Sequence, residues 1–275
     1  MTGLLSTPSS DTSPRVSLTA AALPTPEHVV IVVEENRAQA SVVGSPSAPY
    51  INELTAGGAM MSQSFGETHP SEPNYLALFA GDTFGLKKNE CPVNGGDLPN
   101  LGSELLAAGH TFTGFAEDLP EVGSTACSNG KYARKHVPWV NFSNVPASSS
   151  VPFSAFPAPG NYASLPTVSF VIPNLDNDMH DGSIAQGDAW LKRELSEYAN
   201  WAVANNSLLI VTWDEDDNSH GNQIPTVFYG AHVRPGTYNT RINHYNVLST
   251  LQQMYGLPKT GHAKDAPAIT DIWSD

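Results

Sequence analysis

The sequence predicts an α/β fold in which helices cover both faces of a mostly parallel central sheet. Two apolar, β-branched runs, 28–33 and 207–213, are continuous rather than alternating, which is typical of strands buried on both faces. Such runs alternate along the chain with segments of helical periodicity, of which 184–204 is the longest. This alternation is the pattern of βαβ units around a parallel sheet.

The expected elements follow one another in order from residue 28. Pro73 suits the first turn of a helix, where its missing N–H is not needed, and Gly81 follows the end of that helix. Gly57 and Gly109 close two other helices. In chain order we expect a strand at 28–33, a helix at 48–56, an apolar segment at 59–65, helices at 73–80 and 101–108, strands at 111–116 and 167–172, a helix at 184–204, strands at 207–213 and 226–229, and a helix at 244–254.

A long stretch without periodicity, 118–165, is rich in Pro, Ser, Asn and Gly. A stretch of this length inside a compact domain usually carries function or forms a lid. The two cysteines, Cys91 and Cys127, flank Gly- and Pro-rich sequence. We expect them to form a disulfide that pins a long loop in an oxidising compartment, and two unrelated buried thiols are the alternative.

Length, charge and hydropathy limit the class of protein. The 275 residues suffice for a single domain, which we place at 27–275 after a flexible Ser-, Thr- and Pro-rich leader at 1–26 that is not an intact signal peptide. The formal net charge of −14 argues against nucleic-acid binding, because a basic face is needed to neutralise phosphates. No run of about 18 apolar residues is present, so we expect a soluble, secreted protein without stable membrane insertion.

Each of the two buried strands runs directly into a cluster of polar oxygen donors. Glu35 and Asn36 follow the first strand, and Asp214 and Glu215 follow the second. Because ligands bind at the carboxyl ends of strands in open α/β sheets, both clusters are expected to converge on one site. Their oxygens suit a divalent cation such as Ca²⁺, Mg²⁺, Mn²⁺ or Zn²⁺. Solvated loop charge is the alternative for each cluster.

Ser71 directly precedes an expected helix, where unpaired N–H groups and the positive end of the dipole favour a phosphoryl group and an oxygen nucleophile. Plain N-capping is the alternative. His180 follows another strand, and His220 and His244 follow the acidic cluster, although each suits an ordinary surface or core position too. The G-x-S-x-G turn, the H-E-x-x-H motif and the P-loop are absent, which disfavours an α/β-hydrolase triad.

Six motifs in this order resemble the bacterial phosphoesterase family of phospholipases C and secreted acid phosphatases, a branch of the alkaline phosphatase superfamily. They are VVEEN at 32–36, HPSEPNY at 69–75, FAGD at 79–82, PNLDNDMHD at 173–181, TWDED at 212–216 and NHYNVLST at 243–250. The resemblance spans residues 28 to about 257 and implies an alkaline phosphatase-like three-layer sandwich.

The resemblance also implies roles for individual residues. Metal ligands are implied at Glu35, Asn36, Asp214, Glu215 and, through its oxygen, Ser71. The residue matching Ser71 is the nucleophile of a double displacement through a phosphoseryl intermediate. His180 and Asp181 resemble residues that line the phosphate pocket, and His180 is expected to protonate the leaving oxygen or bind the phosphoryl group. We add His69 and His220 as further catalytic candidates.

The resemblance leaves the substrate class open between two kinds of ester. The chain lacks the Gly-Gly-Phe-type run that follows Asp-Glu in many phospholipases C, and it lacks their C-terminal modules, so we expect a monomeric acid phosphatase acting on phosphate monoesters. The alternative enzyme is a phospholipase C-type phosphodiesterase acting on a phospholipid or phosphoinositide. The non-enzymatic alternative is a secreted module that binds a divalent ion.

Overall fold

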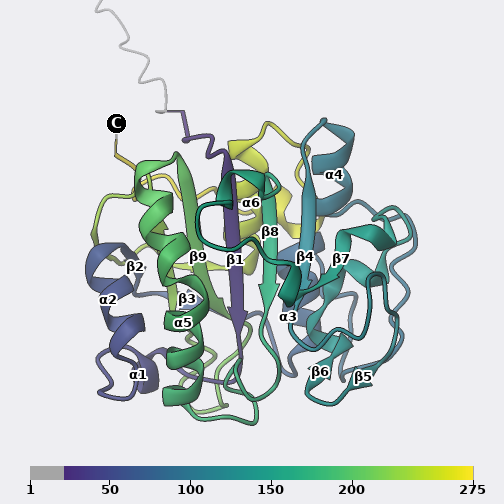
Figure 1. The fold of residues 1–275 in the computed structure, drawn as a ribbon, viewed down its shortest axis with the longest axis horizontal. Helices are drawn as coiled ribbons and strands as arrows, with labels where there is room; N and C mark the ends of the chain where they lie inside the picture. The colour runs from purple at the N-terminus through teal and green to yellow at the C-terminus, as the bar shows by residue number, and fades with distance from the viewer. Residues whose placement is uncertain (1–21, 275) are drawn as a thin grey trace, which may run out of the picture.

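An eight-stranded sheet runs through the middle of the protein in the computed structural model, which describes residues 22–274 (Figure 1). Its strands are β1 (His28–Glu34), β2 (Ala59–Met61), β4 (Phe112–Ala116), β7 (Ser150–Pro152), β8 (Val168–Ile172), β9 (Ser207–Trp213), β10 (Thr226–Gly230) and β11 (Gly236–Tyr238). Their order is β11-β2-β10-β9-β1-β8-β4-β7. Neighbours are parallel except where β10 pairs with β9 and β2, so the predicted mostly parallel sheet is confirmed.

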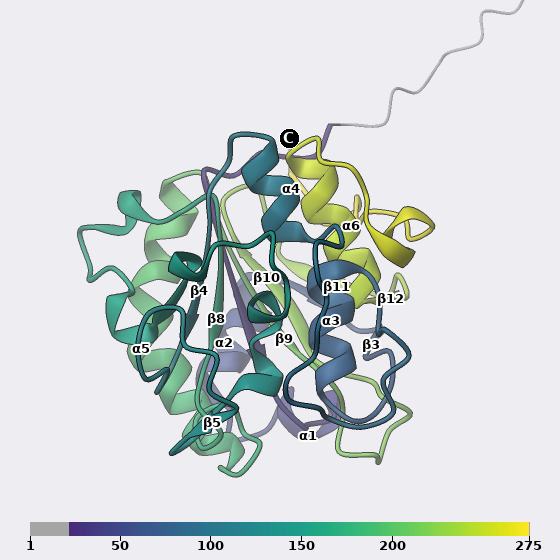
Figure 2. The same cartoon turned by 90° about the vertical axis from the view of Figure 1, so that its right-hand side faces the viewer.

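Helices lie on both faces of the sheet and produce a three-layer arrangement (Figure 2). They are α1 (Gln39–Val42), α2 (Pro49–Gly57), α3 (Glu72–Ala80), α4 (Leu101–Ala107), α5 (Ile184–Ala204) and α6 (His244–Met254). Because successive strand residues point to opposite faces, β1 serves two cores. Val29, Ile31 and Val33 pack with α3, α4 and α6, whereas Val30 and Val32 pack with α2 and α5.

The expected helices and long strands are present within one or two residues of their predicted bounds, and the helices at 184–204 and 244–254 coincide with α5 and α6. Two pairs of very short strands have no counterpart among the predicted strands. These are β3 (Ser64–Phe65) with β12 (Ile242–Asn243) and β5 (Ser128–Asn129) with β6 (Tyr132–Ala133). Two residues are too few to show a period of two, which explains why pattern analysis overlooks them.

The aperiodic stretch contains several short 3₁₀ helices between its turns and short strands. They are η1 (Arg134–His136), η2 (Pro138–Asn141), η3 (Ala147–Ser149), η4 (Phe153–Ala155) and η5 (Tyr162–Ser164), and a further one, η6 (Gly261–Lys264), lies near the C-terminus. Trp139 is buried against Gly114 of β4, where an added Cβ would lie 2.1 Å from the indole ring. Close packing of this kind orders the stretch against the sheet.

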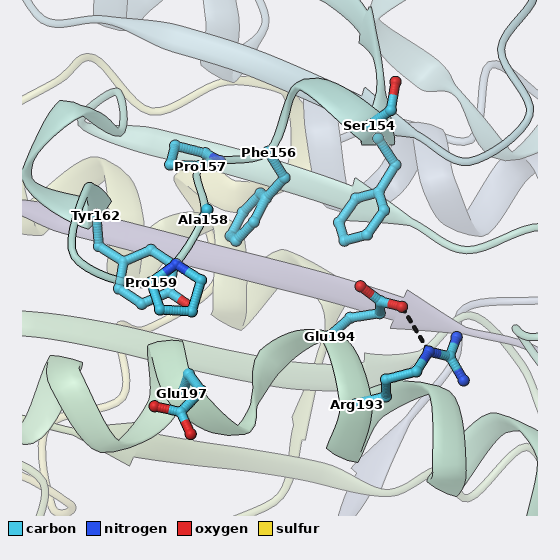
Figure 3. Close-up of a pocket in the computed structure, with 10 residues that line it drawn as sticks. Ser154, Phe156, Pro157, Ala158, Pro159, Tyr162, Arg193, Glu194 and Glu197 are labelled. Atoms are coloured by element: carbon cyan, nitrogen blue, oxygen red, sulfur yellow. Dashed lines mark hydrogen bonds and ion pairs between the residues drawn. The ribbon is translucent and has the colours of Figure 1, made fainter.

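Aromatic side chains attach the segment 153–162 to α5. Phe153 lies 5.1 Å from Trp190 of α5 and stacks on Phe156 at 5.4 Å between ring centroids, and Tyr162 meets Tyr198 edge-on. A cavity of about 320 Å³ remains between this segment and α5. Figure 3 shows side chains that line it, among them Phe156, Tyr162 and Glu197.

The chain's two cysteines form the expected disulfide, with 5.9 Å between the Cα atoms of Cys91 and Cys127. It joins the loop between α3 and α4 to the start of the β5–β6 hairpin, and the Cys127 carbonyl accepts a hydrogen bond from the Arg134 N–H at 3.0 Å. Within the described residues, no helix combines the length and the apolar composition that a membrane span requires. Most of the expected leader, residues 1–21, lies outside the described residues.

Replacing both cysteines, Cys91→Ala with Cys127→Ala, should lower the free energy of unfolding by about 3–4 kcal/mol. The bond spans 36 residues and removes the entropy of closing that loop from the unfolded chain. Urea unfolding monitored by tryptophan fluorescence measures the change, and the reduced wild-type protein should unfold at the same midpoint as the double variant. Equal midpoints for the oxidised wild type and the variant would show that the disulfide contributes nothing.

Candidate active site

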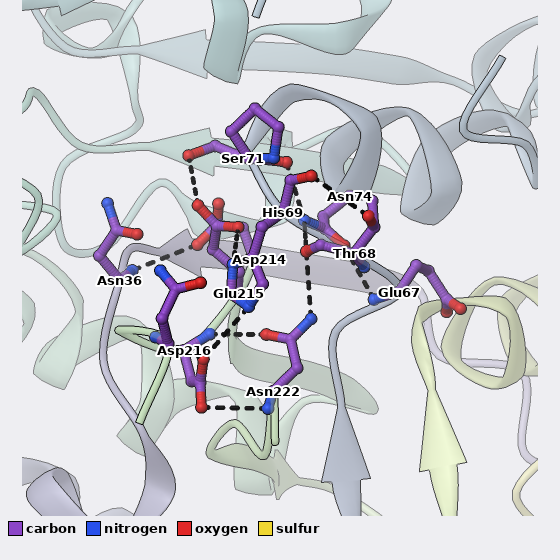
Figure 4. A network of polar contacts seen from close by, with 12 residues as sticks. Asn36, Glu67, Thr68, His69, Ser71, Asn74, Asp214, Glu215, Asp216 and Asn222 are labelled. Atoms are coloured by element: carbon purple, nitrogen blue, oxygen red, sulfur yellow. Dashed lines mark hydrogen bonds and ion pairs between the residues drawn. The ribbon is translucent and has the colours of Figure 1, made fainter. Parts of the chain in front are cut away.

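The register of β1 against β9 brings the two predicted acidic clusters together. Glu34 is paired with Trp213 at the end of the ladder, and the Asp214 N–H donates to the Glu34 carbonyl at 2.9 Å. The next residues, Glu35 and Asp214, therefore emerge side by side, with Glu215 following. All three are buried, and one carboxylate oxygen from each lies within 4.8 Å of the others (Figure 4).

Ser71 lies against this carboxylate cluster. Its side chain is 2% exposed, and its hydroxyl is 3.1 Å from Glu35 Oε2 and 3.0 Å from Glu215 Oε1. Although Ser71 directly precedes α3, its side chain makes no capping hydrogen bond. Figure 4 shows the side chain directed at the cluster instead of the helix. The geometry therefore does not support plain N-capping, and the hydroxyl is held where carboxylate oxygens are its partners.

Asn74 holds the segment before Ser71 in place. Its Oδ1 accepts hydrogen bonds from the N–H groups of Glu67 and Thr68 at 2.8 and 3.0 Å, and its Nδ2 donates to the Thr68 carbonyl at 2.8 Å. Asn74 is fully buried in the first turn of α3. The helix start thus fixes the loop that presents both His69 and Ser71.

His69 connects this loop to the acidic segment after β9. Its Nδ1 is 2.5 Å from Glu215 Oε2, and its Nε2 is 3.4 Å from Asp216 Oδ1. Asp216 in turn accepts hydrogen bonds from the N–H groups of Asn218, His220 and Asn222 at 2.8, 2.8 and 3.0 Å. The His220 side chain itself is exposed, and its ring contacts Ser219 rather than the carboxylate cluster.

His136 is a site residue that the sequence analysis missed. It is 1% exposed, with Nε2 at 2.7 Å from Glu35 Oε1 and Nδ1 at 3.2 Å from Asp178 Oδ2. Burial alone would lower its pKa, but the charges of Glu35 and Asp178 outweigh burial and raise the pKa to about 9. Both ring nitrogens face carboxylates, as an imidazolium requires. The only sequence signal was a basic stretch at 131–136 inside the aperiodic region.

The ion pair between His136 and Glu35 explains why the carboxyl groups of the cluster differ in pKa. Burial raises the pKa of Glu35, but the positive charge of His136 outweighs it and brings the value to about 2. Burial, followed by the charges of Glu35 and Glu215, raises the pKa of Asp214 well above its ordinary value. Burial and Glu35 raise the pKa of Glu215 as well. Asp214 thus lacks the basic partner that Glu35 has in His136 and Glu215 has in His69.

A divalent cation fits this cluster. Asp214 Oδ2 is buried without a hydrogen-bond partner, and buried charged oxygens of this kind are normally paired or coordinate a metal. Three carboxylates are a suitable donor set for a hard or borderline ion. Asn36, predicted as a fourth ligand, lies beside the cluster with its Nδ2 donating to Glu35 Oε2 at 2.9 Å, so in this arrangement it orients Glu35.

His180 and Asp181 lie next to the cluster through His136. The rings of His180 and His136 are 5.9 Å apart, and His180 Nδ1 is 2.8 Å from Asp181 Oδ1. Asp181 also accepts from Lys131 Nζ at 3.0 Å and is 41% exposed. His244, in contrast, is buried with its Nε2 at 2.7 Å from the Asp214 carbonyl, and burial lowers its pKa to about 4. It is a neutral residue that supports the Asp214 backbone.

The model of the Phosphoesterase family matches residues 45–258. The phosphatidylinositol-3-phosphatase of Mycobacterium tuberculosis is 79% identical over 262 residues, which are 95% of this chain and 88% of that protein. The phosphate-repressible acid phosphatase of Penicillium chrysogenum and the acid phosphatase of Aspergillus fumigatus are each 30% identical, over 77% and 80% of this chain. The chain spans about half the length of these two fungal relatives, 55% and 53%.

Solved structures share the fold at low sequence identity. A protein of the alkaline phosphatase superfamily from Vibrio parahaemolyticus matches with a TM-score of 0.61 at 15% identity, over 91% of this chain and 72% of its own. The lipoteichoic acid synthase of Listeria monocytogenes matches with a TM-score of 0.63 at 10% identity, over 86% of this chain and 73% of its own. These likenesses confirm the predicted fold class.

Returning a divalent cation to metal-free protein should raise the melting temperature, and more at about pH 8 than at about pH 5. The raised pKa of Asp214 means that the metal-free protein loses stability as pH rises above the ordinary Asp value near 4, because the folded state then has to hold an unpaired carboxylate. A bound cation offsets that cost and stabilises by about 2.7 kcal/mol at 100 times its dissociation constant.

Thermal melts of chelated protein with excess Mg²⁺, Ca²⁺, Mn²⁺ or Zn²⁺ measure this shift. The matched variant Asp214→Asn should melt higher than wild type in the metal-free state at about pH 8 and respond less to the cation. Unchanged melting of the wild type with all four ions would exclude a cation site at the cluster.

Proposed function

The chain belongs to the phosphoesterase family, and from that premise we propose that it hydrolyses phosphate monoesters through Ser71, with a phosphoinositide as substrate. As a family member it is a phosphoric ester hydrolase, and its relatives carry the names of phosphatases. The observation that carries the assignment of Ser71 is the position of its hydroxyl, buried between Glu35 and Glu215 without a capping role.

The proposed chemistry is a double displacement on phosphorus. Ser71 Oγ forms a bond to phosphorus while the bond from phosphorus to the leaving oxygen breaks, and the hydroxyl proton passes to one of the two carboxylates that face it. Water then attacks the phosphoseryl group, which releases inorganic phosphate and restores the hydroxyl. A divalent cation held by Glu35, Asp214 and Glu215 would supply positive charge that favours the serine alkoxide and offsets charge on the phosphoryl oxygens.

Residues around the cluster have distinct supporting roles in this proposal. His136 holds Glu35 through a buried ion pair, and His69 fixes Glu215. His180 lies beside His136 with Asp181 orienting its ring, so it is placed to protonate the leaving oxygen. His220 is exposed and turned toward Ser219, and we assign it no step.

The choice of substrate rests on the relatives. The 79% identical protein is named for hydrolysis of a phosphoinositide monophosphate, which favours a monoester on an inositol ring over the diester that a phospholipase C cleaves. The more distant fungal relatives are named acid phosphatases, which also supports monoester hydrolysis. The Cys91–Cys127 disulfide supports an oxidising, extracellular location. A monomeric state stays a prediction.

Ser71→Ala should lower kcat on a phosphate monoester by at least about 1000-fold, because no neighbouring hydroxyl occupies the same position between the carboxylates. Steady-state kinetics of the purified variant with the restoring cation measures this, with folding checked by a thermal melt. The matched control is Ser103→Ala in α4, where Ser103 belongs to a true capping box with Asn100. That control should cost about 1 kcal/mol of stability and leave kcat unchanged. A folded Ser71→Ala protein retaining a tenth of wild-type turnover would refute the nucleophile role.

A substrate panel should separate the candidate activities. We expect inorganic phosphate release from phosphatidylinositol 3-phosphate and from a chromogenic monoester, and no release of diacylglycerol from phosphatidylinositol or phosphatidylcholine. Phosphate release measured by colorimetry and diacylglycerol measured by mass spectrometry report the two bond cleavages separately. Diacylglycerol as the main product would favour the phospholipase C alternative, and no product from any ester would favour a binding module.

A further inference from the structure

A basic stretch faces the acidic centre of a protein that is otherwise strongly acidic. Lys131, Arg134, Lys135 and His136 fall within six positions in a chain with a formal charge of −14. Lys131 lies in the turn between β5 and β6, and the other three form η1. Both belong to the arm that the disulfide anchors, and Figure 1 shows this arm at the end of the sheet where β1 and β8 finish. The Leu175 N–H donates to the Lys131 carbonyl at 3.0 Å, which joins the arm to the segment that carries His180.

Three of the four basic side chains pair with groups of the protein itself. Lys131 pairs with Asp176 at 2.7 Å and with Asp181 at 3.0 Å. Arg134 is buried and donates to the Thr125 carbonyl at 2.7 Å. His136 occupies the space between Glu35 and Asp178 with both ring nitrogens. The charges of Lys131 and His136 are thus paired with carboxylates, and Arg134 is directed at backbone carbonyls and Asn141 instead of the centre.

Lys135 differs from them. Its ammonium is 3.1 Å from His180 Nε2, and among the described residues no carboxylate oxygen lies within 4 Å of it. The side chain is half-buried, and it is close enough to Glu35 to help lower the pKa of that carboxyl. Arg37, the other cation beside the centre, uses its guanidinium on the carbonyls of Asn36 and Gly182.

The contact between Lys135 and His180 determines which of the two nitrogens donates the hydrogen bond and which accepts it. An ammonium has three donors and no acceptor, so His180 Nε2 has to be the acceptor and the ring is neutral. The remaining ring proton then sits on Nδ1 and is donated to Asp181 at 2.8 Å. Lys135 thus keeps two N–H donors that no described protein group takes up, at the edge of the carboxylate centre.

The charge of the carboxylate centre indicates which ligand the two free N–H donors of Lys135 would suit. Three carboxylates outnumber the single imidazolium of His136, so one divalent cation does not make the centre positive. A phosphate monoester carries close to two negative charges at neutral pH. Binding it requires a further cation that is not already neutralised, and hydrogen bonds from an ammonium to phosphate oxygens are of the strong, charge-assisted kind.

We propose that Lys135 is a substrate-binding residue whose ammonium donates to non-bridging oxygens of the phosphoryl group, and that His180 holds it in position until the phosphate arrives. The inference rests on the proposed function, since it concerns the phosphate that this same site hydrolyses. When the phosphate takes the ammonium, His180 Nε2 is released from its contact with Lys135 and is free to take up a proton from solvent, which it then passes to the leaving oxygen.

Lys135→Met should weaken binding of inorganic phosphate by about 10- to 100-fold, the range expected for losing a hydrogen bond to a charged group. Isothermal titration of the cation-loaded protein with inorganic phosphate measures this directly, and the inhibition constant of phosphate against a chromogenic monoester should change by the same factor. The matched control is Lys88→Met, because Lys88 is 78% exposed and pairs only with Glu90. It should bind phosphate like wild type.

A chemical rescue separates phosphate binding from a structural role. Lys135→Cys treated with bromoethylamine restores an ammonium at nearly the same reach, and it should recover phosphate binding to within a few-fold of wild type, whereas the untreated variant should not. Phosphate binding of the folded Met or untreated Cys variant at wild-type strength would overturn the proposal. Loss of binding that aminoethylation fails to restore would also overturn it. A wild-type protein that binds phosphate but hydrolyses no monoester would instead contradict the proposed function.

Discussion

The in-register parallel pairing of β1 with β9 is the constraint on which the site depends. All seven residues of β1 are paired with β9, so the residues that follow the two strands leave the sheet at the same level. Glu35 and Asp214 therefore lie close together in the interior. Burying two carboxylates away from water costs free energy. A slip of one residue would turn each side chain to the other face of the sheet and dismantle the cluster.

The other side chains of the site contact the negative charge that the pairing of β1 with β9 brings together. His136 supplies one buried cation to Glu35 from an arm that is distant in sequence, and Ser71 brings a hydroxyl from the start of α3. Asp214 keeps one oxygen without a partner. In our proposal a divalent ion and Lys135 complete the local field, which lets a chain of net charge −14 bind an anionic ester.

Buried carboxylates in this protein fall into two groups according to their partners. Asp216 accepts three backbone N–H donors and orders its own loop, and Asp188 accepts the N–H groups of Tyr50 and Ile51 at the start of α2. Both carboxylates accept backbone hydrogen bonds that hold the local structure in place. Asp214 is not saturated and stands in a cluster. Glu34 has no hydrogen-bond partner among the described residues either, but it stands outside the cluster, and burial raises its pKa well above the ordinary value.

The sequence by itself determined the elements and the acidic half of the site. Continuous apolar runs specify β1 and β9, helical periodicity specifies α5 and α6, and polar residues directly after buried strands can be assigned to one sheet edge because parallel strands end together. Ser71 is predicted as the nucleophile from its place before a helix and from family resemblance. Its contact with the carboxylates could not be derived from that place, which predicts a helix cap equally well.

Only the tertiary structure decided the basic half of the site. His136 and Lys135 come from a stretch without periodicity, and their positions depend on how short 3₁₀ helices pack against the sheet and on the disulfide at Cys127. The exposed position of His220 and the orientation of Asn36 toward Glu35 were likewise decided there. Local sequence pattern carries the period of a helix or strand, whereas contacts between distant loops arise from packing and long-range charge, which leave no period in the sequence.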